Sequence, residues 1–369
     1  GIDFLFKKNK VTKYIGAAKI LSPNEIEIMN GEETEVINAD KIIIATGSES
    51  TNLPNINVDE KKIVTSTGAL ELDKVPQKMI VIGAGIIGLE MGTVWRRLGA
   101  EVEVVEYLPR ILPGIDDEIA NNFMKILQKQ GVKFKLAHSV ENAKIINDKV
   151  LLSVKDINNN THNELDADVA LVSVGRKPNT NGLGLEKLNL KIDKHGFIET
   201  NRNFQTSISN IYAIGDVTKG PMLAHKAEED GVAAVEIMNG EAGHVDYNLV
   251  PGIIYTSPEV AVIGKTEEEL KAEGIAYNKG TFPLMANSRA KAIRHTDGMV
   301  KILSDKYTDK ILGAHMIGHE AGTVIHELSI AMGFGASSED VARICHGHPT
   351  VNEAVKEAAL ATYSKAIHF

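Results

Sequence analysis

The stretch "MIVIGAGIIGLEMGTVWRRLGAEVEVVEY", residues 79–107, decides the fold. It predicts a buried strand, a glycine turn, a helix and a second strand in succession. Gly83, Gly85 and Gly88 form a G-x-G-x-x-G turn between the first strand and the helix. In such a turn the first glycine allows the tight bend, the second lets a pyrophosphate approach the backbone, and the third lets helix and strand pack closely. The stretch therefore predicts a parallel α/β unit with a dinucleotide-binding loop, where the N-terminus of the helix attracts the phosphates.

An acidic residue ends the strand that follows this loop. Glu106 lies eighteen residues after Gly88. A carboxylate at this point accepts hydrogen bonds from both ribose hydroxyls and repels a 2′-phosphate, so the sequence favours NAD over NADP. Two plainer interpretations stay open from these residues alone. The glycine turn could be buried without any ligand, and Glu106 could be a solvated strand end.

Length and composition narrow the class of protein. A chain of 369 residues is too long for one hydrophobic core, so two or three domains are expected. The net charge of -9 argues against a nucleic-acid surface and against attraction to an anionic membrane. The single cysteine excludes a disulfide framework and fits a reducing compartment. The most apolar run, residues 79–95, contains Glu90 and four glycines, which favours a strand and a helix over a membrane span.

The order of predicted elements gives the organisation. Residues 1–50 are typical of short strands with turns, and a linker-like segment follows. Residues 79–175 alternate strand and helix, with a helix over 117–130, which predicts a parallel sheet covered by helices. Two more strands are expected over 197–217, followed by a helix. After Tyr247 the pattern changes to antiparallel hairpins and helices, which indicates a separate α+β domain.

Two more apolar strands end in glycine at a polar tip. They are "IIIATGS", residues 42–48, and "IYAIGD", residues 211–216. Ligands of open α/β sheets collect at the carboxyl ends of strands, so Asp216 could hold a ribose or ribityl hydroxyl. His225 is expected near a helix N-terminus, whose N–H groups could face an anionic ring. Judged alone, the same residues fit two ordinary buried strands equally well.

The segment "CHGHPTVNEA", residues 345–354, combines the only cysteine with two histidines and a glutamate. A metal site would need three or four ligands, and a nucleophilic Cys345 would need a partner that favours its thiolate. We expect Cys345 to pack as a small hydrophobe instead. A general base is favoured, with His348 as the imidazole and Glu353 bonded to its far nitrogen. We expect Pro349 and Thr350 in the first turn of a helix, and structural histidines remain the main alternative, chiefly for His346.

Together these motifs resemble a known family. The matching segments spread across the whole chain in the family's order, and they are "ATGS", "VIGAGIIGLEMGTVWRRLGAEVEVVE", "VSVGRKPNT", "IYAIGDV", "MLAHKAEEDG", "YTSPEVAVIGKTEEEL", "NSRAKA" and "HGHPTVNEA". The chain resembles the pyridine nucleotide–disulfide oxidoreductases, and within them the dihydrolipoamide dehydrogenases, the flavoprotein E3 components of 2-oxoacid dehydrogenase complexes.

The resemblance implies an α/β fold with Rossmann-like domains for FAD and NAD and a C-terminal α+β dimerisation domain. It implies an incomplete FAD-binding domain over 1–76, an NAD-binding domain over 77–197, a return to the FAD-binding or central domain over 198–247 and an interface domain over 248–369. The implied NAD contacts are Gly83, Ala84, Gly85, Ile86, Ile87, Gly88, Leu89, Glu90, Glu106, Val140 and Gly175. The implied FAD contacts are Gly16, Thr46, Gly47, Ser48, Asp216, Met222, Leu223, Ala224 and His225.

The resemblance also implies the reaction and the partners. Dihydrolipoamide would be oxidised through a redox disulfide and FAD, with hydride passed to NAD, while His348 removes a thiol proton and Glu353 supports it. The family forms homodimers, in which the histidine completes the partner's site, and the lipoyl domain of a 2-oxoacid dehydrogenase complex would bring the substrate. We expect a cytoplasmic location, with the mitochondrial matrix as the alternative.

One departure from the family limits these expectations. The sequence has neither the family's first G-x-G-x-x-G nor its C-x4-C redox disulfide, and Cys345 is its only cysteine. We therefore expect the chain to lack the family's N-terminal segment, and the strands at 42 and 211 to lose a strand between them. The alternatives are an NAD-binding and dimerisation module without reductase activity, or a related reductase such as glutathione reductase. The latter would place basic residues near 106 for a 2′-phosphate.

Overall fold

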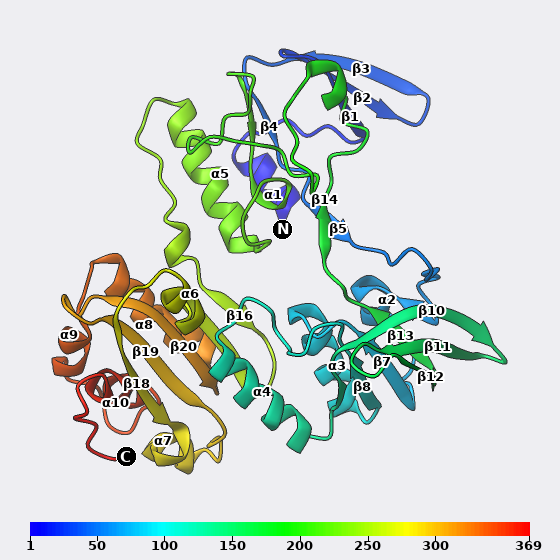
Figure 1. The fold of residues 1–369 in the computed structure, drawn as a ribbon. Coiled ribbons are helices and arrows are strands. Elements are labelled where there is room, and N and C mark those ends of the chain that lie inside the picture. The colour runs from blue at the N-terminus through cyan, green and yellow to red at the C-terminus, as the bar shows by residue number, and fades with distance from the viewer. The chain divides into compact units, whose positions relative to one another are not determined.

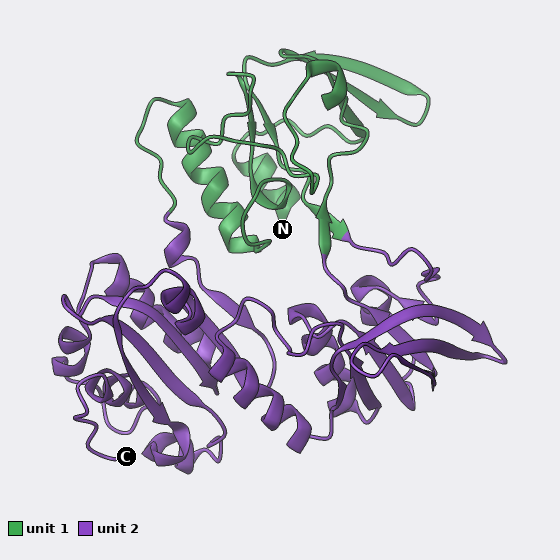
Figure 2. Ribbon diagram, viewed as in Figure 1, with its two compact units in different colours: residues 1–49, 176–245 green, residues 50–175, 246–369 purple.

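The computed structural model describes all residues from 1 to 369, which form two compact units (Figure 1, Figure 2). Unit 1 comprises residues 1–49 and 176–245, and unit 2 comprises residues 50–175 and 246–369. None of the helices has the length and apolar character that crossing a membrane requires.

The division into two units does not test the domain boundaries expected after residues 76, 197 and 247, which stay predictions. Strand β6 (Ile63–Val64) pairs in parallel with β13 (Val169–Val172), which brings the expected linker into the sheet of unit 2. Strand β14 (Arg176–Pro178) pairs with β5 (Ser48–Ser50), so the chain enters unit 1 at residue 176. Pairing between strands that lie far apart in the sequence therefore determines where the two units divide.

A five-stranded parallel sheet forms the first half of unit 2, in the order β6-β13-β7-β8-β9. Its pairings are all parallel, which confirms the predicted α/β class. The strands not yet given are β7 (Lys78–Ile82), β8 (Glu101–Val105) and β9 (Lys133–Lys135). The helices of this half are α2 (Ser66–Leu70), α3 (Ile86–Leu98) and α4 (Asp117–Lys129).

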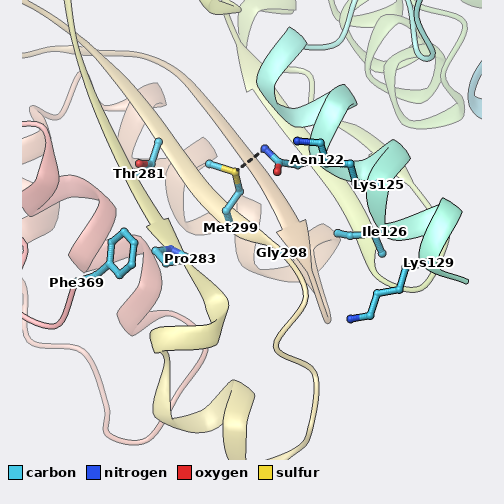
Figure 3. Close-up of a pocket in the computed structure, with 9 residues that line it drawn as sticks. All are labelled: Asn122, Lys125, Ile126, Lys129, Thr281, Pro283, Gly298, Met299 and Phe369. Carbon is cyan, nitrogen blue, oxygen red and sulfur yellow. Dashed lines mark hydrogen bonds between the residues drawn. The ribbon is translucent and has the colours of Figure 1, made fainter.

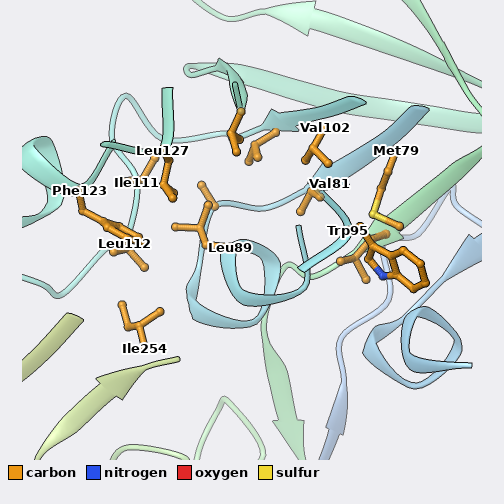
Figure 4. Packing of buried hydrophobic residues seen from close by; sticks show 14 of the residues in the cluster. Met79, Val81, Leu89, Trp95, Val102, Ile111, Leu112, Phe123, Leu127 and Ile254 are labelled. Atoms are coloured by element: carbon orange, nitrogen blue, oxygen red, sulfur yellow. The ribbon is translucent and has the colours of Figure 1, made fainter. Parts of the chain in front are cut away.

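Apolar side chains from the sheet and from both long helices form one core. Val81 and Val102 from the sheet, Leu89 from α3, and Phe123 and Leu127 from α4 are all at most 1% exposed and belong to the same cluster (Figure 4). Each such side chain contributes about 1.5–3 kcal/mol when fully buried. This packing fixes the helix that follows the glycine turn against its strand.

A three-stranded antiparallel sheet adds to this half, with strands β10 (His138–Ile146), β11 (Lys149–Asp156) and β12 (Thr161–Ala167). Alternate residues of β11 are buried, as expected for a strand with one covered face. Val150, Leu152 and Val154 pack in one cluster with Ile80 and Ile82 of β7.

The second half of unit 2 is an antiparallel sheet with helices, the α+β arrangement that was predicted. The sheet runs in the order β16-β17-β20-β19-β18, and its strands are β16 (Gly252–Ile254), β17 (Glu259–Gly264), β18 (Tyr277–Pro283), β19 (Met299–Asp305) and β20 (Ile311–Gly318). The helices are α6 (Glu267–Ala272), α7 (Ser288–Ala292), α8 (Ala321–Gly333), α9 (Ser338–Arg343) and α10 (Glu353–Ala361), with short 3-10 turns η3 (Tyr247–Leu249) and η4 (Leu284–Ala286). Ile325 of α8 and Val355 of α10 share the core of this sheet with Ile302.

Unit 1 is built from short elements and one long helix. They are α1 (Ile2–Lys8), β1 (Ala17–Ser22), β2 (Glu25–Asn30), β3 (Glu33–Asn38), β4 (Ile42–Ile44), η1 (Leu185–Leu188), β15 (Ile211–Ala213), η2 (Gly215–Val217) and α5 (Ala224–Met238), besides β5 and β14. Strands β4 and β15 pair directly and in parallel, with Ile42 opposite Ile211. The expectation of a missing strand between them is therefore wrong, because their own backbone groups bond to each other. The second strand expected over 197–217 is also not formed, and isolated bridges stand in its place.

A buried lysine connects the two halves of unit 2. Lys301 on β19 is 0% exposed, and its Nζ lies 2.9 Å from both oxygens of Asp116, the N-cap of α4. It also lies 2.7 Å from Glu267 on α6 and 3.0 Å from Glu118 on α4. Burial disfavours both charges, yet these bonds hold the pKa of Lys301 above its usual range and that of Glu267 below it. These carboxylates thereby fully compensate the positive charge of Lys301.

His315 on β20 lies beside Lys301 and its carboxylate partners, and it is completely buried. Its Nε2 lies 3.1 Å from the carbonyl oxygen of Lys265, and its Nδ1 has no hydrogen-bond partner. Burial lowers the pKa of His315 to about 4, although Asp116 opposes the shift. The imidazole is therefore neutral near pH 7.

This depressed pKa predicts a pH-dependent stability. Because the unfolded imidazole binds its proton below about pH 6.5 and the folded one only near pH 4, stability falls as pH drops through that window. We expect a loss of about 2 kcal/mol in the free energy of unfolding between pH 7 and pH 5, measured by urea denaturation. His315→Gln should remove this part of the loss, whereas the exposed His162→Gln should leave it unchanged. Equal slopes for His315→Gln and the unchanged protein would contradict the assignment.

Candidate active site

The three glycines of the loop adopt three different environments. Gly83 has a φ of 104°, and a Cβ there would lie 2.5 Å from the carbonyl oxygen of Ser173. Gly88 is packed so closely that a Cβ would lie 2.5 Å from Ser173 Oγ. A Cβ on Gly85 would meet nothing within 4 Å. The turn, the open approach and the close packing expected from the motif are thus all present.

Gly85 is also the N-cap of α3, and no side chain caps this helix. The first N–H groups of a helix have no partner within it, and they carry partial positive charge. Ile86, Ile87 and Gly88 lie in this first turn, beside the open surface of Gly85. An anion such as a pyrophosphate fits this position, so the interpretation as a ligand-free turn is disfavoured.

Glu106 follows directly after strand β8, at the strand end where it was predicted, but it is not solvated, since it is only 8% exposed. One carboxylate oxygen accepts a hydrogen bond from the Ala84 N–H at 2.6 Å, and the other accepts one from the Leu108 N–H at 2.8 Å. The carboxylate thereby ties the strand end to the glycine loop. Each oxygen retains a second lone pair for a ribose hydroxyl.

The remaining predicted NAD contacts are Leu89 and Glu90 on α3, and Val140 and Gly175 elsewhere in unit 2. Leu89 is buried in the core, while the half-buried Glu90 accepts a hydrogen bond from the Tyr255 N–H at 2.7 Å. Burial raises the pKa of Glu90, although that bond opposes the shift. Gly175 has a φ of 124° and bonds through its carbonyl to the Thr51 N–H. Val140 lines a pocket of about 370 Å³ together with Leu53, Pro54, Asn55, Ile56, Ser139 and Glu141.

In unit 1, polar groups gather at the ends of the paired strands β4 and β15. Ser48 Oγ donates to Asp216 at 2.6 Å, and Arg176 donates to Ser48 Oγ at 2.7 Å and to the Ser48 carbonyl at 2.6 Å. Thr46 Oγ1 donates to the Asn179 carbonyl at 2.6 Å. The structure therefore joins two of the predicted FAD contacts, Thr46 and Ser48, to the segment 176–179, whose role the sequence did not single out, and a third, Asp216, to Ser48.

A buried ion pair supports the turn that carries Asp216. Lys226 and Asp230 of α5 are both 0% exposed and lie 2.7 Å apart. Asp230 accepts a hydrogen bond from the Gly215 N–H, while Lys226 donates to the Gly215 carbonyl. This ion pair was not predicted from the sequence. Its only signal was a lysine and an aspartate four residues apart on the partly apolar helix, where a buried pair would face the same side.

The other predicted FAD contacts are four residues around the start of α5 and two glycines. Met222, Leu223, Ala224 and His225 lie at the N-terminus of α5, which Leu223 caps without a side-chain bond. The expected place of His225 is thus confirmed. Gly47 has a φ of 70° and open space around it. Gly16 lies against β2, where a Cβ would come within 2.5 Å of the Met29 carbonyl oxygen, so the glycine has a structural reason of its own.

His348 and Glu353 form the predicted pair. His348 Nδ1 lies 2.9 Å from Glu353 Oε1, and the imidazole is 69% exposed. Glu353 Oε2 accepts a hydrogen bond from the Thr350 N–H at 2.9 Å. Burial opposes ionisation, but this bond and the imidazole hold the pKa of Glu353 below its usual range. Helix α10 begins at Glu353, so Pro349 and Thr350 precede the helix and were wrongly expected inside it.

The other residues of segment 345–354 bear on the metal-site, cysteine-nucleophile and structural-histidine interpretations. Cys345 is exposed, so the expectation that it packs as a small hydrophobe is wrong. It follows Ile344, which ends α9 and is itself exposed. No three His, Cys, Asp or Glu side chains are arranged to hold a metal ion. His346 is the structural histidine, since it is buried beside Glu327.

A further pocket contains none of the predicted site residues. It measures about 340 Å³ and opens between α4 and strands β18 and β19 (Figure 3). Its lining residues are Asn122, Lys125, Ile126, Lys129, Thr281, Pro283, Gly298, Met299 and Phe369. Lys129 is paired with Asp297 at 3.2 Å, and Lys125 lies on the same wall.

Comparison with known sequences and structures agrees with this geometry. The family described as "Pyridine nucleotide-disulphide oxidoreductase" matches residues 1–231, and its dimerisation domain matches residues 250–359. The chain is 56% identical over 370 residues to "Dihydrolipoyl dehydrogenase 2, mitochondrial" of Arabidopsis thaliana and 53% identical over 373 residues to the human "Dihydrolipoyl dehydrogenase, mitochondrial". Both alignments cover 100% of this chain and 73% of the relative.

Similar solved structures extend the comparison. "LpdA" of Mycobacterium tuberculosis superposes with a TM-score of 0.89 and 25% identity, over 97% of this chain and 79% of that one. The "HOCl-induced flavoprotein disulfide reductase RclA" of Escherichia coli superposes with a TM-score of 0.86 and 25% identity, over 97% and 83% of the two chains. The sequence matches and the structural matches thus converge, and the chain belongs to the pyridine nucleotide-disulphide oxidoreductase family.

Proposed function

We propose that this chain belongs to a dihydrolipoyl dehydrogenase, the E3 enzyme that oxidises dihydrolipoamide and passes hydride to NAD. The observation that carries the proposal is the exposed His348 imidazole bonded to the ionised Glu353, on a dimerisation domain, in the same unit as an open glycine cradle. The names of the relatives support it. Because the 369 residues contain one cysteine, they supply no internal cystine for the redox disulfide of this reaction.

The residues around Gly85 fit a bound NAD. The open surface at Gly85 and the uncapped N-terminus of α3 would hold the pyrophosphate, and Glu106 would accept from the ribose hydroxyls. The Glu106 carboxylate would repel a 2′-phosphate, which argues against glutathione reductase as the alternative. Glu90, Val140 and Gly175 would contact other parts of the dinucleotide.

The polar groups at the ends of β4 and β15 fit a bound FAD. Asp216 and Ser48 would hold hydroxyl groups of the cofactor, and the N-terminus of α5 from Met222 to His225 would face its ring. Arg176 positions Ser48, and the Lys226–Asp230 pair positions the turn before Asp216. When bound, FAD supplies the electron transfer between the dithiol and the nicotinamide.

His348 is suited to move a proton at its Nε2 atom. The ionised Glu353 accepts a hydrogen bond from the Nδ1–H group of His348, which leaves the lone pair of Nε2 free on an imidazole that is 69% exposed. Nε2 then takes the proton of a substrate thiol, so that the attacking sulfur is a thiolate, and the adjacent carboxylate stabilises the imidazolium that forms.

The dimerisation domain supports a homodimer as the working form, with His348 completing the partner's site. A lipoyl domain of a 2-oxoacid dehydrogenase complex is the proposed carrier of the substrate. The two dihydrolipoyl dehydrogenases named above are mitochondrial, which gives no support to the expected cytoplasmic location, and we place the protein in the mitochondrial matrix.

The direct test is an assay of the enzyme that contains this chain. We expect oxidation of dihydrolipoamide with NAD, and a kcat/KM at least about 100-fold lower with NADP, because Glu106 repels the 2′-phosphate. Preference for NADP or for glutathione disulfide would reject the proposal. Binding of NADH without any dithiol oxidation would favour the second candidate, an NAD-binding and dimerisation module, which the single cysteine supports.

Gly85→Ala should separate binding from stability. The added methyl meets no protein atom and the φ of Gly85 is -79°, so the melting temperature should stay within about 2 °C. The methyl fills the approach of the pyrophosphate, so the Kd for NADH, read by fluorescence titration, should rise by about tenfold or more. Gly88→Ala should instead lower the melting temperature, because its methyl collides with Ser173 Oγ and the Gly83 carbonyl. Unchanged NADH binding by Gly85→Ala would contradict the assigned cradle.

Glu353→Gln should weaken the proton transfer. The amide keeps the size of the side chain but loses the charge that stabilises the protonated imidazole. We expect kcat to fall by about tenfold to 100-fold, with the acidic limb of the pH–rate profile moving to lower pH. The Kd for NADH should not change. A variant with the rate and profile of the unchanged enzyme would refute the role of Glu353.

A further inference from the structure

Two residues before His348 the structure contains a second histidine–glutamate pair with the opposite exposure. The side chain of His346 is 6% exposed, and its Nε2 lies 2.7 Å from Glu327 Oε1 on α8. Its Nδ1 lies 3.0 Å from the carbonyl oxygen of Ile344. Since both ring nitrogens are bonded inside the protein, His346 has no nitrogen left for a substrate.

The second oxygen of Glu327 holds the other end of the same segment. Asn352 Nδ2 donates to Glu327 Oε2 at 2.6 Å. The Glu327 carboxylate on α8 therefore bonds His346, which precedes His348, and Asn352, which follows it. Glu353, which holds the His348 imidazole, follows directly after Asn352.

Between these two anchors the segment is open to solvent. Gly347, His348 and Pro349 are exposed, whereas Thr350 bonds through its carbonyl to Asn287 at 3.0 Å. An exposed loop tip samples several conformations unless its ends are fixed. The bonds to Glu327 supply that restraint from the helix, which is itself packed in the core through Ile325 and Leu328.

We propose that Glu327, His346 and Asn352 are positioning residues, which clamp the 346–352 segment on α8 so that His348 and Glu353 keep their catalytic geometry. The inference rests on the proposed dihydrolipoamide oxidation. None of the three contacts the reacting sulfur; they act through His348. A displacement of about 1 Å at a reacting group can cost about 100-fold in rate, so the clamp acts on kcat.

The test uses Glu327→Ala and Asn352→Ala in the enzyme that contains this chain. Glu327→Ala removes both bonds of the clamp, because alanine has no side-chain oxygen to accept from His346 or Asn352. Asn352→Ala removes one bond and leaves the helix core intact. We expect kcat for dihydrolipoamide oxidation to fall by about tenfold or more in Glu327→Ala and by a smaller factor in Asn352→Ala, with KM and the NADH Kd within about twofold. Amide exchange of residues 345–351 should become about tenfold faster in both.

Glu339→Ala is the matched control. Glu339 lies on the neighbouring helix α9 in an exposed pair with Arg343, and its substitution should change neither kcat nor exchange. The double variant of Glu327 and Asn352 should be no slower than Glu327→Ala alone, because Glu327→Ala already removes both bonds of the clamp.

Normal kcat in both variants, or a lower kcat with unchanged exchange of 345–351, would overturn the inference. If Glu327→Ala does not fold, Asn352→Ala decides alone. If the unchanged enzyme does not oxidise dihydrolipoamide, the proposed function fails, and unchanged exchange in the variants would still overturn the clamp separately.

Discussion

The structure of unit 2 depends on one buried cation. Lys301 has no access to solvent, and it is compensated by Asp116 and Glu118 at the start of α4 and by Glu267 on α6. A buried ion pair adds little net stability, but removing one partner leaves an uncompensated charge that costs about 3–5 kcal/mol. The interaction therefore acts as a constraint on arrangement. It holds the helix of the parallel sheet to the antiparallel sheet, and thus keeps the glycine loop and the His348 segment in one compact unit.

Within that unit, glutamates perform different tasks according to their surroundings. Glu106 is buried and bonded to backbone N–H groups, so it shapes the strand end that would receive a ribose. Glu353 is ionised beside an exposed imidazole, which suits proton transfer. Glu327 makes a similar bond to a buried imidazole, which leaves no nitrogen for chemistry and only restrains the loop. Exposure of the histidine, rather than the pairing itself, separates the catalytic pair from the structural one.

Much of the fold and the site could be predicted because the signals were local. The alternation of strands and helices predicted the parallel sheet, and the spacing of Gly83, Gly85 and Gly88 predicted their three environments. The general-base interpretation of residues 345–354, together with the family resemblance, also predicted the hydrogen bond between His348 and Glu353. One failure was local, since Pro349 and Thr350 precede α10 and were expected inside it. The others depended on how distant segments pack. Cys345 was expected to be buried, the place of a missing strand was expected between β4 and β15, and residues 51–77 were expected to be a linker outside the parallel sheet. None of these can be read from neighbours along the chain.

By itself, the sequence determined the order of elements, the dinucleotide loop and the identity of the candidate base, because turn geometry, helical period and short spacings are encoded within a few residues. Only the tertiary structure decided that Glu106 is tied to the loop, that Arg176 reaches Ser48, that Lys301 is buried among carboxylates, and that Glu327 clamps both sides of His348. These are bonds between residues 19 to 185 positions apart. Their formation depends on which surfaces the packed core brings together, and that is a property of the whole chain.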